Sequence, residues 1–185
     1  MALPMVARHL FAMVLLPGTI AVWVPVWIAR RQGITFTPPR AGLELVAVAA
    51  GVFALAVGIT LFIASLSRFV SIGRGTLAPW DPPRHLVVRG PYRYVRNPMI
   101  SGVVFVAFGE ALILRSSPHF LWALFFLVNN LIWIPLYEEP SLEQRFGGDY
   151  RTYRRHVPRF IPRLRPWSPQ SASRDAPPSR PASMA

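Results

Sequence analysis

The sequence predicts an all-α integral membrane protein: a bundle of about four transmembrane helices with a cytoplasmic C-terminal amphipathic segment. Of the 185 residues, 52% are hydrophobic, and they gather in several long runs that soluble domains rarely carry. The net charge is +12, and every basic residue is an arginine. Such a surplus orients a membrane protein and contacts anionic lipid headgroups. Nucleic acid is a weaker interpretation of the charge, because the arginines flank the apolar runs.

Four apolar runs are candidates for crossing the bilayer, since about 20 helical residues span a hydrocarbon core roughly 30 Å thick. We expect the spans near residues 10–28, 43–66, 99–114 and 119–137. The first run contains Pro17, Gly18 and Pro25 and should be kinked, as membrane helices tolerate. A cleaved signal peptide is the rival interpretation of this run, and its length argues against that. The third run is short for a crossing, so a re-entrant segment remains an alternative there.

Small and polar residues inside these runs predict contacts between helices. Gly51 and Gly58 in the second run allow a neighbouring helix to approach closely. Glu110 in the third run either reaches the interface or a neighbouring helix, or lines a polar cavity. Asn129 and Asn130 in the fourth run either join helices or contact a ligand.

The distribution of arginines predicts the orientation of the bundle. With a cytoplasmic N-terminus and four spans, sixteen of the twenty arginines lie on the cytoplasmic side. The outer loops carry the other four, Arg30, Arg31, Arg40 and Arg115. The positive-inside rule is then satisfied, with both termini cytoplasmic in a multi-pass protein, which we expect in a bacterial inner membrane. The 73–98 loop and everything after Tyr137 consequently share the cytoplasmic face.

The segment after the fourth run is polar and interrupted by turn residues. We expect a short helix over 142–146 that ends at Gly147 and Gly148, then a second over 150–156 with Asp149 as its N-cap. The second helix is amphipathic, with its tyrosines on one face and its arginines on the other. The tail, residues 168–185, is rich in Ser, Pro and Ala and is predicted to be disordered, so residues 1–167 form a single domain.

The polar groups on the cytoplasmic face suit a ligand with separated charges and a flat base. Arg93 and Arg96 are able to grip a carboxylate or phosphate, and Glu138 and Glu139 to neutralise an ammonium or sulfonium. Aromatic faces come from Trp80, Tyr92, Tyr94, Tyr150 and Tyr153. Close backbone approach is possible at Gly73 and Gly75. S-adenosylmethionine carries the matching parts: adenine, sulfonium, ammonium and carboxylate.

No metal site is expected. The chain has no cysteine, and its four histidines are scattered without ligand spacing.

Two motifs resemble one family of membrane enzymes. The first is Gly90-Pro-Tyr-Arg-Tyr-x-Arg-Asn-Pro-Met followed by Gly102. The second is Tyr137-Glu-Glu-Pro with Leu142, Phe146-Gly147, Tyr150, Tyr153 and Val157-Pro158-x-x-Ile161-Pro162. Together with Gly73-x-Gly75-Thr76 they resemble the membrane methyltransferases, which include isoprenylcysteine carboxyl methyltransferases and phospholipid (phosphatidylethanolamine) N-methyltransferases. The resemblance covers roughly residues 43–165.

The resemblance implies a helical membrane enzyme of lipid metabolism whose cofactor is S-adenosylmethionine. The cofactor would sit at the cytoplasmic edge, held by the segment 138–165, and a lipophilic substrate would come from the bilayer. Glu138 and Glu139 match the acidic cofactor-binding pair of the phospholipid enzymes. Positions 96, 97, 98 and 102 match the Arg-His-Pro-x-Tyr-x-Gly block of the prenylcysteine enzymes. Asn97 and Ile100 depart from that block and resemble the phospholipid branch more closely.

From this resemblance we expect the methyl group to move by direct SN2 displacement, which depends on placement more than on acid–base machinery. Arg96 would fix a carboxylate or phosphate, and Glu139 is the candidate base for an amine acceptor. The expected cofactor contacts are Gly73, Gly75, Tyr92, Arg96, Asn97, Pro98, Gly102, Glu138, Glu139, Tyr150 and Tyr153.

Several alternatives remain open from the sequence. The arginines at 93 and 96 are alternatively topology determinants, the two glutamates part of an ion-pair network, and the tyrosines an interfacial belt. At the level of the whole protein, the alternatives are an NADPH-dependent membrane reductase and a non-enzymatic membrane protein. The acceptor, whether a phospholipid amine, a prenylcysteine-type carboxylate or another lipophile, and the oligomeric state stay open.

Overall fold

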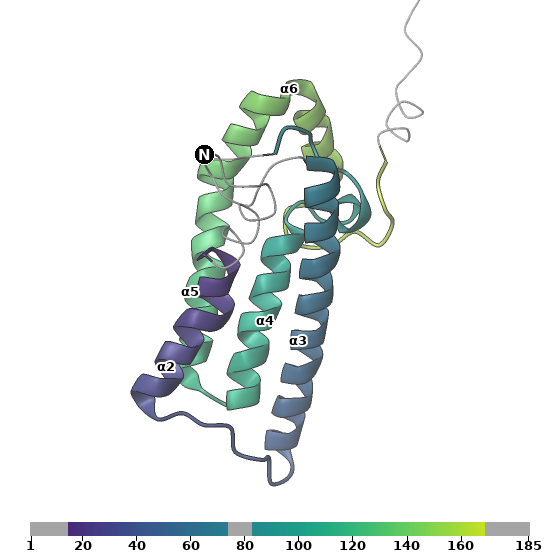
Figure 1. The fold of residues 1–185 in the computed structure, drawn as a ribbon. Coiled ribbons are helices and arrows are strands. Elements are labelled where there is room, and N and C mark those ends of the chain that lie inside the picture. Colours follow the sequence, from purple (N-terminus) through teal and green to yellow (C-terminus); the bar gives the residue numbers. More distant parts are fainter. Residues whose placement is uncertain (1–14, 74–82, 169–185) are drawn as a thin grey trace, which may run out of the picture.

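In the computed structural model, which describes residues 15–73 and 83–168, the secondary structure of the described part is helical and contains no strand (Figure 1). The helices are η1 (Thr19–Trp23), α2 (Val24–Gln32), α3 (Leu43–Arg68), η2 (Phe69–Gly73), η3 (Gly90–Arg93), α4 (Pro98–Leu114), α5 (Ser117–Trp133), η4 (Ile134–Glu138) and α6 (Glu139–His156). Three of the short elements, η1, η2 and η4, are π-helical turns, and η3 is a 3₁₀ turn. The predicted all-helical class is therefore confirmed.

Two continuous helices are long and apolar enough to cross a membrane. They are Leu43–Gly73, which joins α3 to η2, and Ser117–His156, which joins α5, η4 and α6. The second predicted span thus extends to Gly73 rather than stopping at 66, and the fourth continues without a break into the polar segment. The apolar part of the second helix ends near Tyr137. Beyond it, α6 is polar and bends at Gly147, whose φ of 54° interrupts the helix.

The other two predicted spans correspond to shorter helices. Helix α4 has 17 residues, most of them apolar, and its length at 1.5 Å per residue is roughly 26 Å. The described part of the first run forms η1 and α2, while residues 10–14 lie outside the described residues. A bundle of four crossings and its orientation stay predictions. The 168–185 tail also falls outside the described residues apart from Ser168.

Helices α3 and α4 pack against each other at glycines. A Cβ added at Gly58 would lie 2.7 Å from the carbonyl oxygen of Gly102, and one at Gly51 would lie 2.8 Å from that of Gly109. Since real Cβ atoms do not approach backbone this closely, the two backbones touch only because these side chains are absent. The expectation that Gly51 and Gly58 admit a neighbouring helix is confirmed.

The π turn η1 and helix α2 are tied to α5 through two backbone carbonyls, one of which a proline leaves without a donor. In the π turn η1, the Val24 N–H donates to the Thr19 carbonyl, so the next donor in the series would be Pro25, which has no N–H. The indole of Trp122 donates to the freed Ile20 carbonyl at 3.0 Å instead. The Pro25 carbonyl accepts from Nε2 of buried His119 at 3.1 Å. Side chains of α5 thus donate hydrogen bonds to two backbone carbonyls of the kinked helix formed by η1 and α2.

Polar residues inside the predicted third and fourth spans have local roles. The Asn130 amide donates to the Phe126 carbonyl of its own helix at 2.8 Å, and Asn129 is exposed. One carboxyl oxygen of Glu110 is buried and has no hydrogen-bond partner among the described residues. Neither asparagine hydrogen-bonds to another helix in the described part of the chain.

The polar segments meet at one end of the helices. In Figure 1, η3, the bend of α6 and the chain after His156 all lie at the end where α3 finishes and α4 begins. Residues 158–167 run antiparallel to 93–96. Three backbone hydrogen bonds of 2.9–3.0 Å join them. The N–H of Arg96 donates to the carbonyl of Pro158, the N–H of Arg163 to the carbonyl of Tyr94, and the N–H of Trp167 to the carbonyl of Arg93. This pairing, here called the clasp, fixes the C-terminal segment onto the loop before α4.

Candidate functional site

A cavity of about 450 Å³ opens at this polar end. Its wall is contributed by η2, by residues 83–87, by η3 and the start of α4, and by the continuous helix from Trp133 to Tyr153. The volume lies within the range of ligand pockets, roughly 300–1,000 Å³. Phe69, Met99, Ile100 and Trp133 give one side of the wall an apolar character, while Arg96 and Glu138 bring charge.

Three tyrosines form the aromatic part of the cavity wall. Tyr92, Tyr150 and Tyr153 are each at most 8% exposed, and the Tyr153 hydroxyl donates to the Tyr92 carbonyl at 2.7 Å. Burial raises the pKa of Tyr92 and of Tyr153, and it raises that of Tyr150 to about 12, against the opposing effect of Arg96. All three phenols therefore stay neutral and are able to donate hydrogen bonds at physiological pH.

A second apolar layer supports these tyrosines. Tyr150 and Tyr153 form one buried cluster with Val157 and Trp167, and Leu86, Val88, Leu142 and Phe146 pack against it. Tyr150 and Tyr153 share a face of α6 as expected. The predicted N-cap, Asp149, lies inside the second half of α6, because the residue with non-helical backbone is Gly147. Trp167 comes from the far end of the clasp, so the clasp also closes the hydrophobic core beneath the cavity.

The two adjacent glutamates have different environments. Glu138 lines the cavity, and no ion pair to it occurs within the described part of the chain. Burial, and secondarily the charge of Glu139, raise the pKa of Glu138. Glu139 does not line the cavity and is only 4% exposed.

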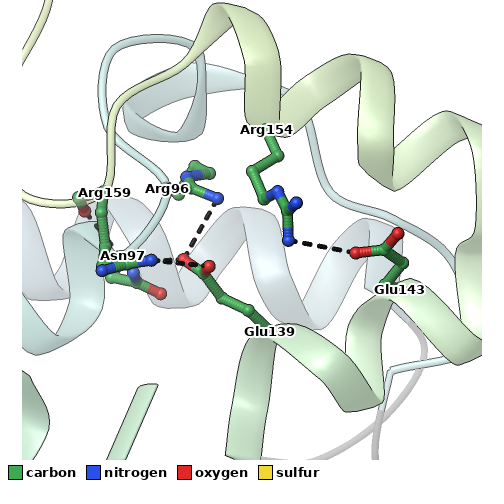
Figure 2. Close-up of polar contacts among 6 residues, drawn as sticks. All are labelled: Arg96, Asn97, Glu139, Glu143, Arg154 and Arg159. Atoms are coloured by element: carbon green, nitrogen blue, oxygen red, sulfur yellow. Dashed lines mark hydrogen bonds and ion pairs between the residues drawn. The ribbon is translucent and has the colours of Figure 1, made fainter. Parts of the chain in front are cut away.

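Glu139 is the buried centre of a cluster of charges (Figure 2). Arg159 holds it with two hydrogen bonds, Nε to Oε1 at 2.6 Å and Nη2 to Oε2 at 2.8 Å. Arg96 approaches from the cavity side, with Nη1 at 3.1 Å from Oε1. Figure 2 shows the two guanidinium groups converging on this carboxylate, while Arg154 and Glu143 form a separate, more exposed pair further along α6. Both oxygens of Glu139 are thus occupied, which is the ion-pair alternative that the sequence left open.

The structure brings together most of the residues expected to contact a cofactor. Six of them line the cavity: Tyr92, Arg96, Asn97, Glu138, Tyr150 and Tyr153. Pro98 starts α4 and is buried, and Gly102 lies against Gly58 of α3, so neither lines the cavity. Gly73 is buried next to Pro83 and Val87 behind the wall, and its carbonyl accepts from the Arg84 N–H at 2.7 Å.

Other expected residues fall elsewhere. Gly75 and Trp80 lie outside the described residues. Arg93 turns away from the cavity, because its Nε donates to the Trp167 carbonyl at 2.7 Å. Tyr94 is exposed and does not line the cavity. No group of three acidic or histidine side chains that would hold a metal occurs in residues 15–73 and 83–168.

Sequence reasoning missed Arg159, Ser141 and Arg145. Ser141 and Arg145 line the cavity from the first half of α6. Arg159 occupies one of the two unassigned positions in the Val157-Pro158-x-x-Ile161 motif, so the motif located it without indicating a role. The available signal was a cation between two prolines, Pro158 and Pro162, within the segment 138–165 that was expected to hold the cofactor.

Comparison with known families decides the class of the protein. The family model described as phospholipid methyltransferase matches residues 46–149, more than half of the chain. The chain belongs to the phospholipid methyltransferase family. The match runs from α3 into α6 and so includes Arg96, Glu138 and Glu139, while residues 158–167, among them Arg159, lie beyond its end. Neither the curated proteins nor the solved structures gave a match.

Membership of this family confirms the resemblance inferred from the two motifs and suggests that the chain is an enzyme. The family implies methyltransferase activity at a membrane, in agreement with the two helices long and apolar enough to cross one.

Proposed function

We propose that this protein transfers a methyl group from S-adenosylmethionine to a lipophilic acceptor, with both bound in the cavity at the polar end of the helices. The observation that carries the proposal is the placement of Arg96 and Glu138 in one cavity with three neutral tyrosines, in a member of the phospholipid methyltransferase family. Arg96 matches the carboxylate of the cofactor's amino acid, Glu138 matches the sulfonium, and the aromatic wall matches the adenine.

The fit of the cofactor is supported by unsatisfied groups of the cavity. Nε and Nη1 of Arg96 are buried and have no hydrogen-bond partner among the described residues, although Nη1 is in ion-pair range of Glu139. Buried donors without an acceptor are costly, so a ligand that supplies a carboxylate there is favoured. Glu138 would face the positively charged part, and the faces of Tyr92 and Tyr150 would contact the base.

When bound, S-adenosylmethionine supplies an electrophilic methyl group that a nucleophile takes in one in-line displacement. The chain holds the reactants in place and excludes water, and both effects raise the rate of methyl transfer. A carboxylate acceptor needs no base. For an amine acceptor, we assign proton acceptance to Glu138 rather than to Glu139, because Glu138 lines the cavity with a raised pKa while both Glu139 oxygens bind arginines.

The apolar side of the cavity suits an acceptor that comes from the bilayer. Trp133 and Tyr137 stack at 4.3 Å on the continuous helix, line the cavity and are more than half exposed on the outside. Phe69 lines the same cavity from η2. A lipid tail would therefore meet aromatic surface both outside the protein and within the wall. A phospholipid amine and a prenylcysteine-type carboxylate are the acceptor classes that we propose.

Calorimetric titration of the detergent-purified protein with S-adenosylhomocysteine, in parallel with NADPH, tests the cofactor. We expect micromolar binding of S-adenosylhomocysteine, no binding of NADPH, and loss of at least tenfold in affinity in Glu138→Gln, since about 1.4 kcal/mol corresponds to tenfold. Glu143→Gln is the matched control, because Glu143 is a glutamate of the same helix that pairs with exposed arginines away from the cavity. Binding of NADPH alone would favour the reductase, and binding of neither nucleotide would refute the enzyme proposal.

The acceptor is tested by transfer of a radiolabelled methyl group. Labelled S-adenosylmethionine is incubated with the protein and vesicles that contain either phosphatidylethanolamine or a prenylated cysteine with a free carboxylate. Label in the phospholipid fraction would identify an amine acceptor, and base-labile label in the second would identify a carboxylate. Label in neither lipid, despite cofactor binding, would refute both proposed acceptor classes.

A further inference from the structure

Arg159 lies outside the cavity, yet it makes the closest contacts in the charged cluster. Its two hydrogen bonds to Glu139, at 2.6 and 2.8 Å, form the bidentate arrangement in which guanidinium and carboxylate groups match best. The Glu139 carboxylate raises the pKa of Arg159 further above its usual value, so this arginine stays charged. Arg159 therefore neutralises Glu139 in the protein interior.

Arg96 contacts the same carboxylate more weakly than Arg159 does. It reaches only Oε1, through one nitrogen at 3.1 Å, and the same oxygen already accepts from Arg159 at 2.6 Å. The Arg96 side chain is nevertheless 9% exposed and lines the cavity. A buried guanidinium whose Nε has no hydrogen-bond partner among the described residues, and whose counter-charge is shared, has attraction left for an additional anion.

Other charged groups that line the cavity do not remove this attraction. Glu138 is the only carboxyl group among the described lining residues, and its raised pKa reflects the cost of charging it there. Arg145 and His85 line the cavity from exposed positions and add no negative charge. The strength with which Arg96 attracts a further anion therefore depends on how completely Arg159 neutralises Glu139.

The clasp carries Arg159 to this position. The Pro158 carbonyl accepts from the Arg96 N–H at 2.9 Å, and the Arg159 carbonyl accepts from the Asn97 amide at 3.5 Å. Residues 158 and 159 thus contact the backbone of Arg96, the side chain of its neighbour, and the carboxylate that Arg96 shares.

We propose that Arg159 is a positioning residue: by neutralising Glu139 it leaves the charge of Arg96 available for the carboxylate of the ligand bound in the cavity. This inference rests on the proposed function, because it takes the ligand to be an adenosyl amino acid. Arg159 itself would not touch the ligand.

Two ligands separate an electrostatic role from a general one. S-adenosylhomocysteine carries the carboxylate, whereas 5′-methylthioadenosine keeps the base, ribose and sulfur but lacks the amino acid. In Arg159→Gln, Glu139 is left to Arg96 alone, so we expect affinity for S-adenosylhomocysteine to fall about tenfold, the loss of one charge-assisted hydrogen bond. Affinity for 5′-methylthioadenosine should stay within about twofold of the wild type, because its binding needs no anion contact.

A second substitution tests the charge logic and guards against misfolding. Glu139→Gln in the Arg159→Gln background removes the carboxylate that captures Arg96, so we expect it to recover at least half of the lost affinity on a logarithmic scale. Arg159→Lys keeps the charge and should lose less affinity than Arg159→Gln. Arg154→Gln is the matched control, since Arg154 forms an exposed ion pair of 3.0 Å with Glu143, and both residues lie on α6.

The outcomes are distinct. Equal losses for both ligands in Arg159→Gln, or a further loss in the double variant, would mean that Arg159 only supports the fold, and the inference would be wrong. Unchanged S-adenosylhomocysteine affinity in Arg159→Gln would overturn it while leaving the proposed function intact. Absence of S-adenosylhomocysteine binding in the wild type would overturn both.

Discussion

The α3–α4 contact gives a sharp test of what Gly102 does. Sequence resemblance places Gly102 among the cofactor contacts, whereas in the structure it lies against α3. A Cβ at this position would be 2.9 Å from the Gly58 carbonyl oxygen, 2.9 Å from the Phe62 nitrogen and 3.1 Å from the Phe62 Cβ. The two closest atoms belong to backbone, which cannot rotate away as a side chain does. Gly102→Ala therefore has to push the helices apart.

The magnitude follows from two opposing effects. Overpacking of a close contact costs about 1–3 kcal/mol. Replacing a helical glycine by alanine returns about 1 kcal/mol through helix propensity. Because the two closest atoms are backbone, we take the upper half of that range, about 2–3 kcal/mol, and expect Gly102→Ala to destabilise the protein by about 1–2 kcal/mol. For a chain of this size each kcal/mol lowers the melting temperature by about 2–4 °C, which gives a decrease of roughly 2–8 °C.

Thermal unfolding in detergent, followed by tryptophan fluorescence, measures this decrease. Gly148→Ala is the control, because Gly148 is also helical but its added Cβ would meet no atom within 4 Å. This control should melt at the wild-type temperature or slightly above it. A Gly102→Ala protein that melts like the wild type but binds S-adenosylhomocysteine more weakly would refute the packing argument and return Gly102 to the site.

Changes at three further residues test the site and the hydrogen bond that ties η1 to α5. Because burial and a neighbouring carboxylate raise the pKa of Glu138, S-adenosylhomocysteine binding should weaken as pH falls through a window above the usual glutamate range, and calorimetry on Glu138→Gln should show that dependence removed. In the ligand-free protein, the contribution of Glu138 to the free energy of unfolding should be complete below the usual glutamate pKa and lost as the pH rises through the raised pKa. The melting temperature of the wild type should therefore fall over that pH window, and that of Glu138→Gln should not. Tyr153→Phe leaves the Tyr92 carbonyl without its donor and should cost about 1–2 kcal/mol in thermal unfolding; no change would mean that water replaces the hydroxyl. Trp122→Phe removes the donor to the Ile20 carbonyl and should cost about 1 kcal/mol by the same measurement, with an unchanged melting temperature counting against the anchor.

The helical class was predictable because long apolar runs allow few other structures in a bilayer. The glycines at 51 and 58 also predicted a close helix contact, which the structure confirms. The helix ends were less predictable. The pattern of the second run becomes polar near Ser67, yet π-helical turns carry the backbone on to Gly73. A hydrophobic pattern indicates which residues face lipid, but it does not indicate whether the helix continues beyond the apolar layer.

Six of the eleven residues that the sequence predicted as cofactor contacts line the cavity, but their geometry could not be predicted. The tyrosines, Arg96 and Glu138 line one cavity because the clasp folds the C-terminal segment back onto residues 93–96. That pairing uses backbone hydrogen bonds, which carry no side-chain signature in the sequence. Sequence reasoning also could not separate Glu138 from Glu139, since neighbouring identical residues carry the same chemistry until the fold gives them different partners.

The two glutamates lie where a π turn joins α5 to α6. Pro135 and Pro140 have no N–H to donate, so the ordinary hydrogen-bond series is broken at both ends of the turn. Within it, the Glu139 N–H donates five residues back to the Ile134 carbonyl, which widens the turn by one residue. Residues after the turn are consequently offset from the face set by α5. Glu138 remains on the cavity face with Trp133, while Glu139 points to Arg159 on the clasp. Because adjacent residues of a helix point in directions about 100° apart, the acidic pair is divided into a carboxyl group that lines the cavity and a carboxylate that binds Arg159.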